Sequence, residues 1–339
     1  MLCSVVIANR NDFISLCVTV RSAFEEFRAI GGDGEVVIVD NSDPDIWEGI
    51  KSGSMVSGQY VKNNQLQLHR QEFPCLFTAR ETAIRNAKGK YVLCVDSHVL
   101  FGYNMIRDLV EFMERHNDPK IAFAHAPLNW AHQHDSAKRH DRNMDLDIIG
   151  RGGMSAWGKG YDHERTISWK GMPWICRRDF FLNDLNGYGA LSQHKMSWPG
   201  DPHIGIKPWL LGFENWAVPC SPGIHLGPFP KKAMNLHKYR IYTGKTGTYD
   251  NTISSMVSTY ILGGEEVLRK YGWIMLRCMK GDDNGTLKDK FNSRIDKSLP
   301  EVKMLAKDEV EWMEKHRVMS FDEMLKSKPW TNRASQSDA

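Results

Sequence analysis

An aspartate and a histidine separated by one serine, Asp96-Ser97-His98, are the residues of this chain whose types and spacing most directly suggest chemistry. In extended backbone, side chains two residues apart project to the same side, so the carboxylate and the imidazole can bind one cation while Ser97 faces away. Oxygen and imidazole ligands together suit manganese or a similar ion better than calcium. The same three residues are also compatible with a strand-end turn that carries a solvated histidine.

Two predicted strands place acidic residues at one edge of a sheet. Residues 35–40 and 90–96 are strongly apolar runs that end in Asp40 and Asp96, and near-continuous hydrophobicity is typical of parallel strands buried on both faces. Ligands of open α/β sheets bind outside the carboxyl ends of the strands, so both aspartates are placed to meet a ligand. A single aspartate in such a place is also a common loop-capping residue.

The first 125 residues alternate the hydrophobic patterns of strands and helices. We expect strands over residues 3–8, 35–40, 90–96 and 121–125, and helices over residues 13–27, 78–88 and 104–115. Asp12 can cap the first of these helices. The alternation predicts an α/β fold with a mostly parallel central sheet flanked by helices. The chain contains neither G-x-G-x-x-G nor G-x-x-x-x-G-K-[ST], which argues against a dinucleotide-binding fold and against a P-loop.

The composition is that of an ordinary globular protein. The chain has 339 residues, of which 41% are hydrophobic and 25% charged, and its net charge of +3 neither demands nor excludes a polyanionic partner. Its seven cysteines form no C-x-x-C pair, so neither a disulfide framework nor a zinc finger is indicated. The first apolar run is too short for a membrane span and lacks the features of a signal peptide. We therefore expect a cytoplasmic protein without a transmembrane segment.

The segment that contains the Asp96-His98 pair resembles a known family. Residues 79–98, ARETAIRNAKGKYVLCVDSH, look like the donor-site segment of family 2 glycosyltransferases, and the D-x-H form resembles the polypeptide N-acetylgalactosaminyltransferases. Residues 4–10, SVVIANR, and residues 37–42, VIVDNS, fit the same superfamily. The resemblance implies the GT-A nucleotide-diphosphosugar transferase fold, a UDP-sugar donor and a Mn²⁺ or Mg²⁺ ion. It also implies that the donor is contacted by Ala8, Asn9, Arg10, Asp40, Arg80, Asp96 and Ser97.

Two later segments resemble the acceptor side of the same enzymes. Residues 197–201, SWPGD, stand in the place of a W-G-x-E/D motif, and residues 219–225, PCSPGIH, are similar to the stretch that supplies a further histidine ligand. The resemblance therefore implies a metal site made of Asp96, His98 and His225. It implies for Asp201 either the role of general base or the role of orienting the acceptor.

The resemblance also suggests how the chain is divided. We expect a GT-A catalytic domain over residues 1–240, in which residues 1–126 bind the nucleotide sugar and residues 127–240 bind the acceptor. Residues 241–339 would form a C-terminal helical extension, with helices at 265–271 and 307–316. Within the acceptor part, four tryptophans either stack on a sugar or pack in the core: Trp169, Trp174, Trp198 and Trp209.

The implied reaction is the transfer of a hexose or N-acetylhexosamine from a UDP-sugar to a hydroxyl. The acceptor would be a protein serine or threonine, or a hydroxymethylated DNA base if the enzyme is encoded by a phage. Alternatives are a glycan or lipid-linked sugar as acceptor, and a non-catalytic nucleotide-sugar-binding protein. General family 2 members invert the anomeric centre and the polypeptide-modifying relatives retain it, so the resemblance of the D-x-H pair and the later histidine to the latter favours retention. The sequence leaves open the donor sugar, the acceptor, the inverting or retaining outcome and the oligomeric state.

Overall fold

The computed structural model describes residues 1–52, 65–130, 164–167, 173–196, 200–226, 249–280 and 286–327. Within them, eight strands form a sheet in the order β3-β2-β1-β4-β9-β6-β10-β8. In this order their bounds are Leu66–Arg70, Gly34–Asp40, Cys3–Asn9, Tyr91–Asp96, Trp174–Arg177, Ile121–His125, Glu214–Ala217 and Glu164–Arg165. The first four strands are mutually parallel. The sheet is therefore mostly parallel, as the sequence predicts.

The one interior strand that runs the other way is β9, which lies antiparallel to both β4 and β6. A second, small sheet has the order β5-β11-β7, with bounds Val99–Leu100, Gly223–His225 and Leu128–Trp130. Strand β5 follows β4 after two residues. The small sheet therefore begins at the carboxyl end of a central strand, where ligands of such folds bind.

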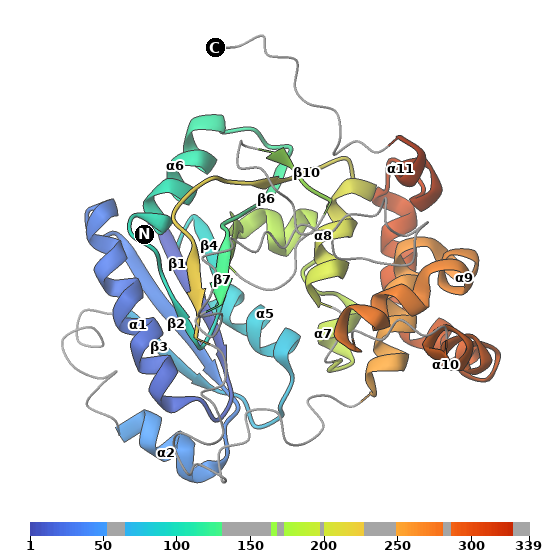
Figure 1. The fold of residues 1–339 in the computed structure, drawn as a ribbon, viewed down its shortest axis with the longest axis horizontal. Coiled ribbons are helices and arrows are strands. Elements are labelled where there is room, and N and C mark those ends of the chain that lie inside the picture. The colour runs from blue at the N-terminus through green and yellow to red at the C-terminus, as the bar shows by residue number, and fades with distance from the viewer. Residues whose placement is uncertain are drawn as a thin grey trace.

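Helices cover both faces of the large sheet, because alternate side chains of each buried strand point to opposite layers. Val5 and Ile7 of β1 pack in one hydrophobic cluster with α1 (Phe13–Phe27) and α6 (Met105–His116). Val6 faces the other cluster, which contains α5 (Leu76–Asn86). Figure 1 shows α1 and α5 on either side of the sheet. A further helix, α2 (Pro44–Ser52), follows β2.

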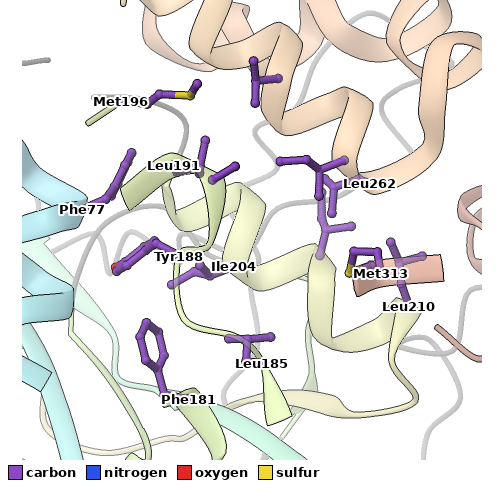
Figure 2. Packing of buried hydrophobic residues seen from close by; sticks show 14 of the residues in the cluster. Phe77, Phe181, Leu185, Tyr188, Leu191, Met196, Ile204, Leu210, Leu262 and Met313 are labelled. Atoms are coloured by element: carbon purple, nitrogen blue, oxygen red, sulfur yellow. The ribbon is translucent and has the colours of Figure 1, made fainter. Parts of the chain in front are cut away.

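The C-terminal helices pack on the α5 side of the sheet and share its core. They are α9 (Asn251–Lys280), which is kinked at Gly263 and Gly264, α10 (Thr286–His316) and α11 (Phe321–Ser327). They contact α7 (Ala190–Gln193) and α8 (Gly200–Leu210). Leu210 of α8, Leu262 of α9 and Met313 of α10 belong to the same buried cluster (Figure 2). The predicted boundary at residue 240 lies outside the described residues.

The predicted elements of the first 125 residues agree with the structure to within two residues at each end. One local prediction is wrong: Asp12 precedes α1, but its side chain makes no capping hydrogen bond. Its carboxylate instead accepts hydrogen bonds from Ser97 and His98. Two of the four tryptophans, Trp174 and Trp209, are core residues with 0% and 3% of their surface exposed, while Trp169 and Trp198 lie outside the described residues. No helix among the described residues is both long and apolar enough to cross a membrane.

Candidate functional site

Three side chains from two distant segments meet at the carboxyl end of β4. Asp96 is the last residue of β4, and His98 lies between β4 and β5. His225 joins them because β11 pairs antiparallel with β5, which aligns His225 with Val99. The His98 and His225 Nε2 atoms are 3.1 Å apart, and His225 Nε2 is 3.6 Å from Asp96 Oδ2. One ligand atom of each residue lies within 4.8 Å of the others.

The geometry of these three side chains fits a single divalent cation. Two imidazole nitrogens bound to one ion at about 2.1 Å, with a right angle between them, lie about 3 Å apart. The observed separation of 3.1 Å matches that arrangement. One carboxylate oxygen and two imidazole nitrogens are a donor set suited to manganese and other first-row ions.

Arg80 of α5 lies directly behind the carboxylate of this cluster. Its Nη2 donates to Asp96 Oδ1 at 2.9 Å, which leaves Oδ2 facing His225. Burial raises the pKa of the Asp96 carboxyl, but the hydrogen bond from His225 and the charge of Arg80 outweigh burial and hold this pKa well below its ordinary value. The Asp96 side chain, which is 27% exposed, is therefore ionised and ready to bind a cation at neutral pH.

His98 is fixed from the opposite side by Asp12. The two side chains are buried, and Nδ1 of His98 lies 2.9 Å from Asp12 Oδ2. Since an ionised carboxylate only accepts hydrogen bonds, Nδ1 carries the hydrogen, which leaves the Nε2 lone pair of the neutral ring for a ligand. Burial lowers the pKa of His98, but Asp12 and the charge of Asp96 outweigh burial and raise it above its ordinary value. Binding of a cation to Nε2 therefore competes with a proton.

The second predicted aspartate, Asp40, is completely buried at the end of β2 and organises three strand ends. Its Oδ1 accepts from the Ser42 backbone N–H and from Arg70 Nη1, each at 3.0 Å. Its Oδ2 accepts from Asn9 Nδ2 at 2.6 Å and from the Ser42 hydroxyl at 2.8 Å. Sequence reasoning identified Asp40 and Asn9 but missed Ser42 and Arg70. Direct contact between Asp40 and a nucleotide remains a prediction.

Polar atoms without protein partners surround this network. Among the described residues, Asn9 Oδ1, Arg10 Nη1 and Asn41 Nδ2 are buried and have no hydrogen-bond partner. Buried polar groups are normally hydrogen-bonded, so these two donors and one acceptor without partners invite a polar ligand. Asn9 and Asp40 lie opposite each other in the pairing of β1 and β2, and Ala8 lies opposite Asp96 in the pairing of β1 and β4. The register therefore places the predicted nucleotide contacts beside the candidate metal ligands.

Two predicted residues remain, Ser97 and Asp201. Ser97 is buried, and its hydroxyl donates to Asp12 Oδ2 at 3.3 Å and lies 3.5 Å from His98 Nδ1. Asp201 lies in the first turn of α8, but its side chain is outside the described part of the structure. Much of the predicted acceptor part, including residues 131–163 and 227–240, also lies outside the described residues. The acceptor role of Asp201 remains a prediction.

Comparison with known proteins relates this chain to glycosyltransferases. Residues 4–132 match the family model for glycosyl transferase family 2. The chain has the GT-A fold, and the matched segment is similar to family 2 glycosyltransferases. The matched segment includes β1, β2 and β4, and with them Asp40, Asp96 and His98. Comparison with curated protein sequences gave no match.

Two solved structures of glycosyltransferases share the fold of this chain. One is GalNAc-T7 with UDP, GalNAc and Mn²⁺, with a TM-score of 0.60 and 16% identity over 97% of this chain and 58% of that one. The other is S. aureus TarS 1–349 in complex with UDP-GlcNAc, with a TM-score of 0.51 and 13% identity over 97% of this chain and 92% of that one. This chain thus spans just over half the length of the GalNAc-T7 chain. At these identities the likeness shows the fold.

Proposed function

We propose that this protein is a metal-dependent glycosyltransferase that moves a hexose or an N-acetylhexosamine from a UDP-sugar to a hydroxyl acceptor. The observation that carries the proposal is the meeting of Asp96, His98 and His225 at the carboxyl end of β4. Mn²⁺ or Mg²⁺ is the ion that we propose for them. Both structural relatives were solved with UDP or a UDP-sugar, and GalNAc-T7 also with Mn²⁺, which supports the same class of donor here.

The three ligands and their neighbours define what this site contributes. A divalent ion held by Asp96, His98 and His225 would neutralise the negative charge that develops on the departing diphosphate. Arg80 holds Asp96 Oδ1, so the other carboxylate oxygen faces the histidines. The carboxylate and two imidazoles carry one negative charge between them when the rings are neutral, so the bound ion keeps a net positive charge. That charge makes the site attractive to a diphosphate.

The nucleoside is proposed to bind at the ends of β1 and β2. Asn9, Arg10 and Asn41 each present a buried polar atom without a protein partner among the described residues. Asp40 holds Asn9 and Ser42 in place through the hydrogen bonds described above. The backbone of Ala8 pairs with β2 on one side and β4 on the other. We therefore propose that the base and ribose are recognised here, one strand away from the cation.

The acceptor is proposed to be a hydroxyl that enters from the side of α8. Asp201 lies in the first turn of this helix, and we propose that its carboxylate orients the acceptor hydroxyl or removes its proton. A protein serine or threonine, a hydroxymethylated DNA base and a glycan all offer such a hydroxyl. The D-x-H pair together with His225 favours a retaining reaction.

UDP release tests this function directly. The protein is incubated with Mn²⁺ and a panel of UDP-hexoses and UDP-N-acetylhexosamines, in the presence of peptides, hydroxymethylated DNA or simple glycans. We expect UDP release that depends on both the metal and one class of acceptor, with the sugar recovered on that acceptor. EDTA should abolish the reaction, and added Mn²⁺ should restore it.

Three outcomes separate the proposal from its competitors. Glycosylated acceptor supports a transferase, whereas UDP-sugar binding without product would identify a non-catalytic binding protein. Release of inorganic phosphate would indicate a phosphoesterase. Asp96→Ala and His225→Ala should each lower the transfer rate by at least about 100-fold, because each removes a ligand of the ion. Glu111→Gln, which changes an exposed carboxylate on α6, is the matched control and should leave the rate unchanged.

A further inference from the structure

We propose that Asp12 is a positioning residue of the metal site, which holds the His98 ring so that Nε2 faces the cation. The inference rests on the proposed function, because it concerns the ion that Asp96, His98 and His225 would hold. Asp12 itself contacts neither Asp96 nor His225 in the structure and acts through His98. Its role would be to fix the orientation and the tautomer of that one ligand.

The first observation is the contact itself. The Asp12 side chain is 7% exposed and its Oδ2 lies 2.9 Å from Nδ1 of His98, whose side chain is 5% exposed. On the other side of the ring, Nε2 lies 3.1 Å from His225 Nε2. The imidazole is thus held between a carboxylate and the candidate metal position. With an ion bound, this would be the arrangement of a carboxylate–histidine–metal triad, in which the carboxylate fixes the ring and raises the basicity of the ligating nitrogen.

The second observation is that Asp12 does not perform the local task suggested by its place in the chain. It occupies the N-cap position of α1, where aspartate is among the preferred residues because its side chain accepts from the first free backbone N–H groups. In the structure that side chain makes no capping hydrogen bond. Both of its described side-chain contacts go to the segment after β4, to Ser97 and to His98. The carboxylate thus serves the metal site rather than the helix.

The third observation is that α1 holds the backbone of this segment as well. The Thr19 hydroxyl donates to the Ser97 carbonyl and accepts from the Val99 N–H, each at 3.0 Å. The backbone on either side of His98 is therefore fixed to α1 independently of Asp12. Removal of the Asp12 carboxylate should free the His98 ring while leaving the chain path intact. This separation makes the role of Asp12 testable.

The test is direct Mn²⁺ binding to the protein, measured by electron paramagnetic resonance with UDP present. Asp12→Ala should weaken Mn²⁺ binding by about 10- to 100-fold, the range found for such outer carboxylates. Asp12→Asn keeps the shape of the side chain and an acceptor oxygen but loses the charge. The Mn²⁺ affinity of this variant should therefore lie between that of the wild type and that of Asp12→Ala. Asp45→Asn, which changes an exposed aspartate on α2, is the matched control and should bind like the wild type.

A spectroscopic readout separates positioning from a structural role. In the metal-free wild type, ¹⁵N spectra of the histidine rings should show His98 protonated at Nδ1, and Asp12→Ala should lose that preference. Circular dichroism measures whether Asp12→Ala and Asp12→Asn are folded, and Mn²⁺ affinity is compared with the wild type only for a folded variant. Mn²⁺ affinity within about threefold of the wild type in a folded Asp12 variant would overturn the inference. Absence of Mn²⁺ binding by the wild type would instead overturn the proposed function.

Discussion

The Nε2 atoms of His98 and His225 lie 3.1 Å apart, although the two residues are 127 positions apart in the chain. They meet because β5 leaves the carboxyl end of β4 and pairs with β11, which places His225 opposite Val99. Leu226 adds to this connection, since its N–H donates to the His98 carbonyl at 2.8 Å. The small sheet thus converts two separate segments into one site beside Asp96.

Asn41 is expected to contribute to nucleotide binding without contributing to stability. Its Nδ2 is buried and has no partner among the described residues, so loss of the amide removes no protein hydrogen bond. Asn41→Ala should weaken UDP binding by about 2- to 10-fold, the value of one hydrogen bond. Isothermal titration calorimetry with UDP measures the affinity. Asn86→Ala at the end of α5 is the control, and equal UDP affinity of the Asn41 variant and the wild type would refute the assignment.

The ion pair between Lys207 of α8 and Glu309 of α10 is expected to stabilise the packing of α10 against α8. Both side chains are almost fully buried, and Asn186 also donates to Glu309. Glu309→Gln or Lys207→Met should lower the free energy of unfolding by about 3–5 kcal/mol, because each leaves a buried charge unpaired. Urea denaturation measures the change.

Two further variants make the ion-pair prediction specific. The double variant Lys207→Met/Glu309→Leu should recover most of the lost stability, because it leaves no unpaired charge. Glu265→Gln breaks two exposed pairs of Glu265, with Arg269 on α9 and with Lys303 on α10, and should leave stability unchanged within error. A double variant as unstable as the single variants would show that the loss of stability comes from packing rather than from an unpaired charge.

His203 of α8 is expected to make stability depend on pH. It is completely buried, and burial together with the charge of Lys207 lowers its pKa from 6.5 to about 3. Between these values the unfolded chain binds the proton and the folded protein does not, so stability is full above pH 6.5 and falls as the pH decreases toward 3. The slope from this group is about 1.4 kcal/mol per pH unit.

Urea denaturation at a series of pH values measures that slope. His203→Gln should remove the contribution of this residue. Between pH 6.5 and pH 4, the unfolding free energy of the variant should therefore fall less steeply than that of the wild type, and the two slopes should differ by about 1.4 kcal/mol per pH unit. His116→Gln, at an exposed position on α6, should retain the wild-type slope. Identical slopes for His203→Gln and the wild type would contradict the assignment.

Gly89 is expected to be required for the close approach of β1 to the start of β4. A Cβ atom there would lie 2.6 Å from both the backbone nitrogen and the hydroxyl of Ser4. Gly89→Ala should lower the free energy of unfolding by about 1–3 kcal/mol, as overpacking does. A Cβ at Gly49 in α2 would meet nothing within 4 Å, so Gly49→Ala should stabilise by about 0.5–1 kcal/mol. Thermal denaturation distinguishes the two, and equal effects would contradict the explanation.

The sequence predicts the β-α-β framework well because its strands and helices have regular hydrophobic periods. The strand over residues 121–125, for example, appears in the structure with the same bounds. Strand β9 was not predicted, because it has four residues and its place between β4 and β6 is decided by tertiary packing. The order of the strands therefore could not be read from local patterns alone.

Part of the candidate site could be predicted because the hydrophobic periods also locate the ends of the strands. Asp40 and Asp96 follow from strand ends, but the meeting of His98 with His225 depends on a long-range pairing that local spacing does not reveal, and only the family resemblance suggested it. Asp12 was interpreted as a helix cap because its local surroundings fit that role. Lys207 and Glu309 stand 102 positions apart and show no sequence pattern that links them.

The most direct measurement of the central claim is a crystal structure of the protein with Mn²⁺ and UDP, with diffraction data collected at the manganese absorption edge. The account predicts one anomalous peak within coordination distance of Asp96 Oδ2, His98 Nε2 and His225 Nε2, and in contact with the diphosphate of UDP. Bound UDP with manganese held elsewhere, or with no manganese near these three residues, would contradict it.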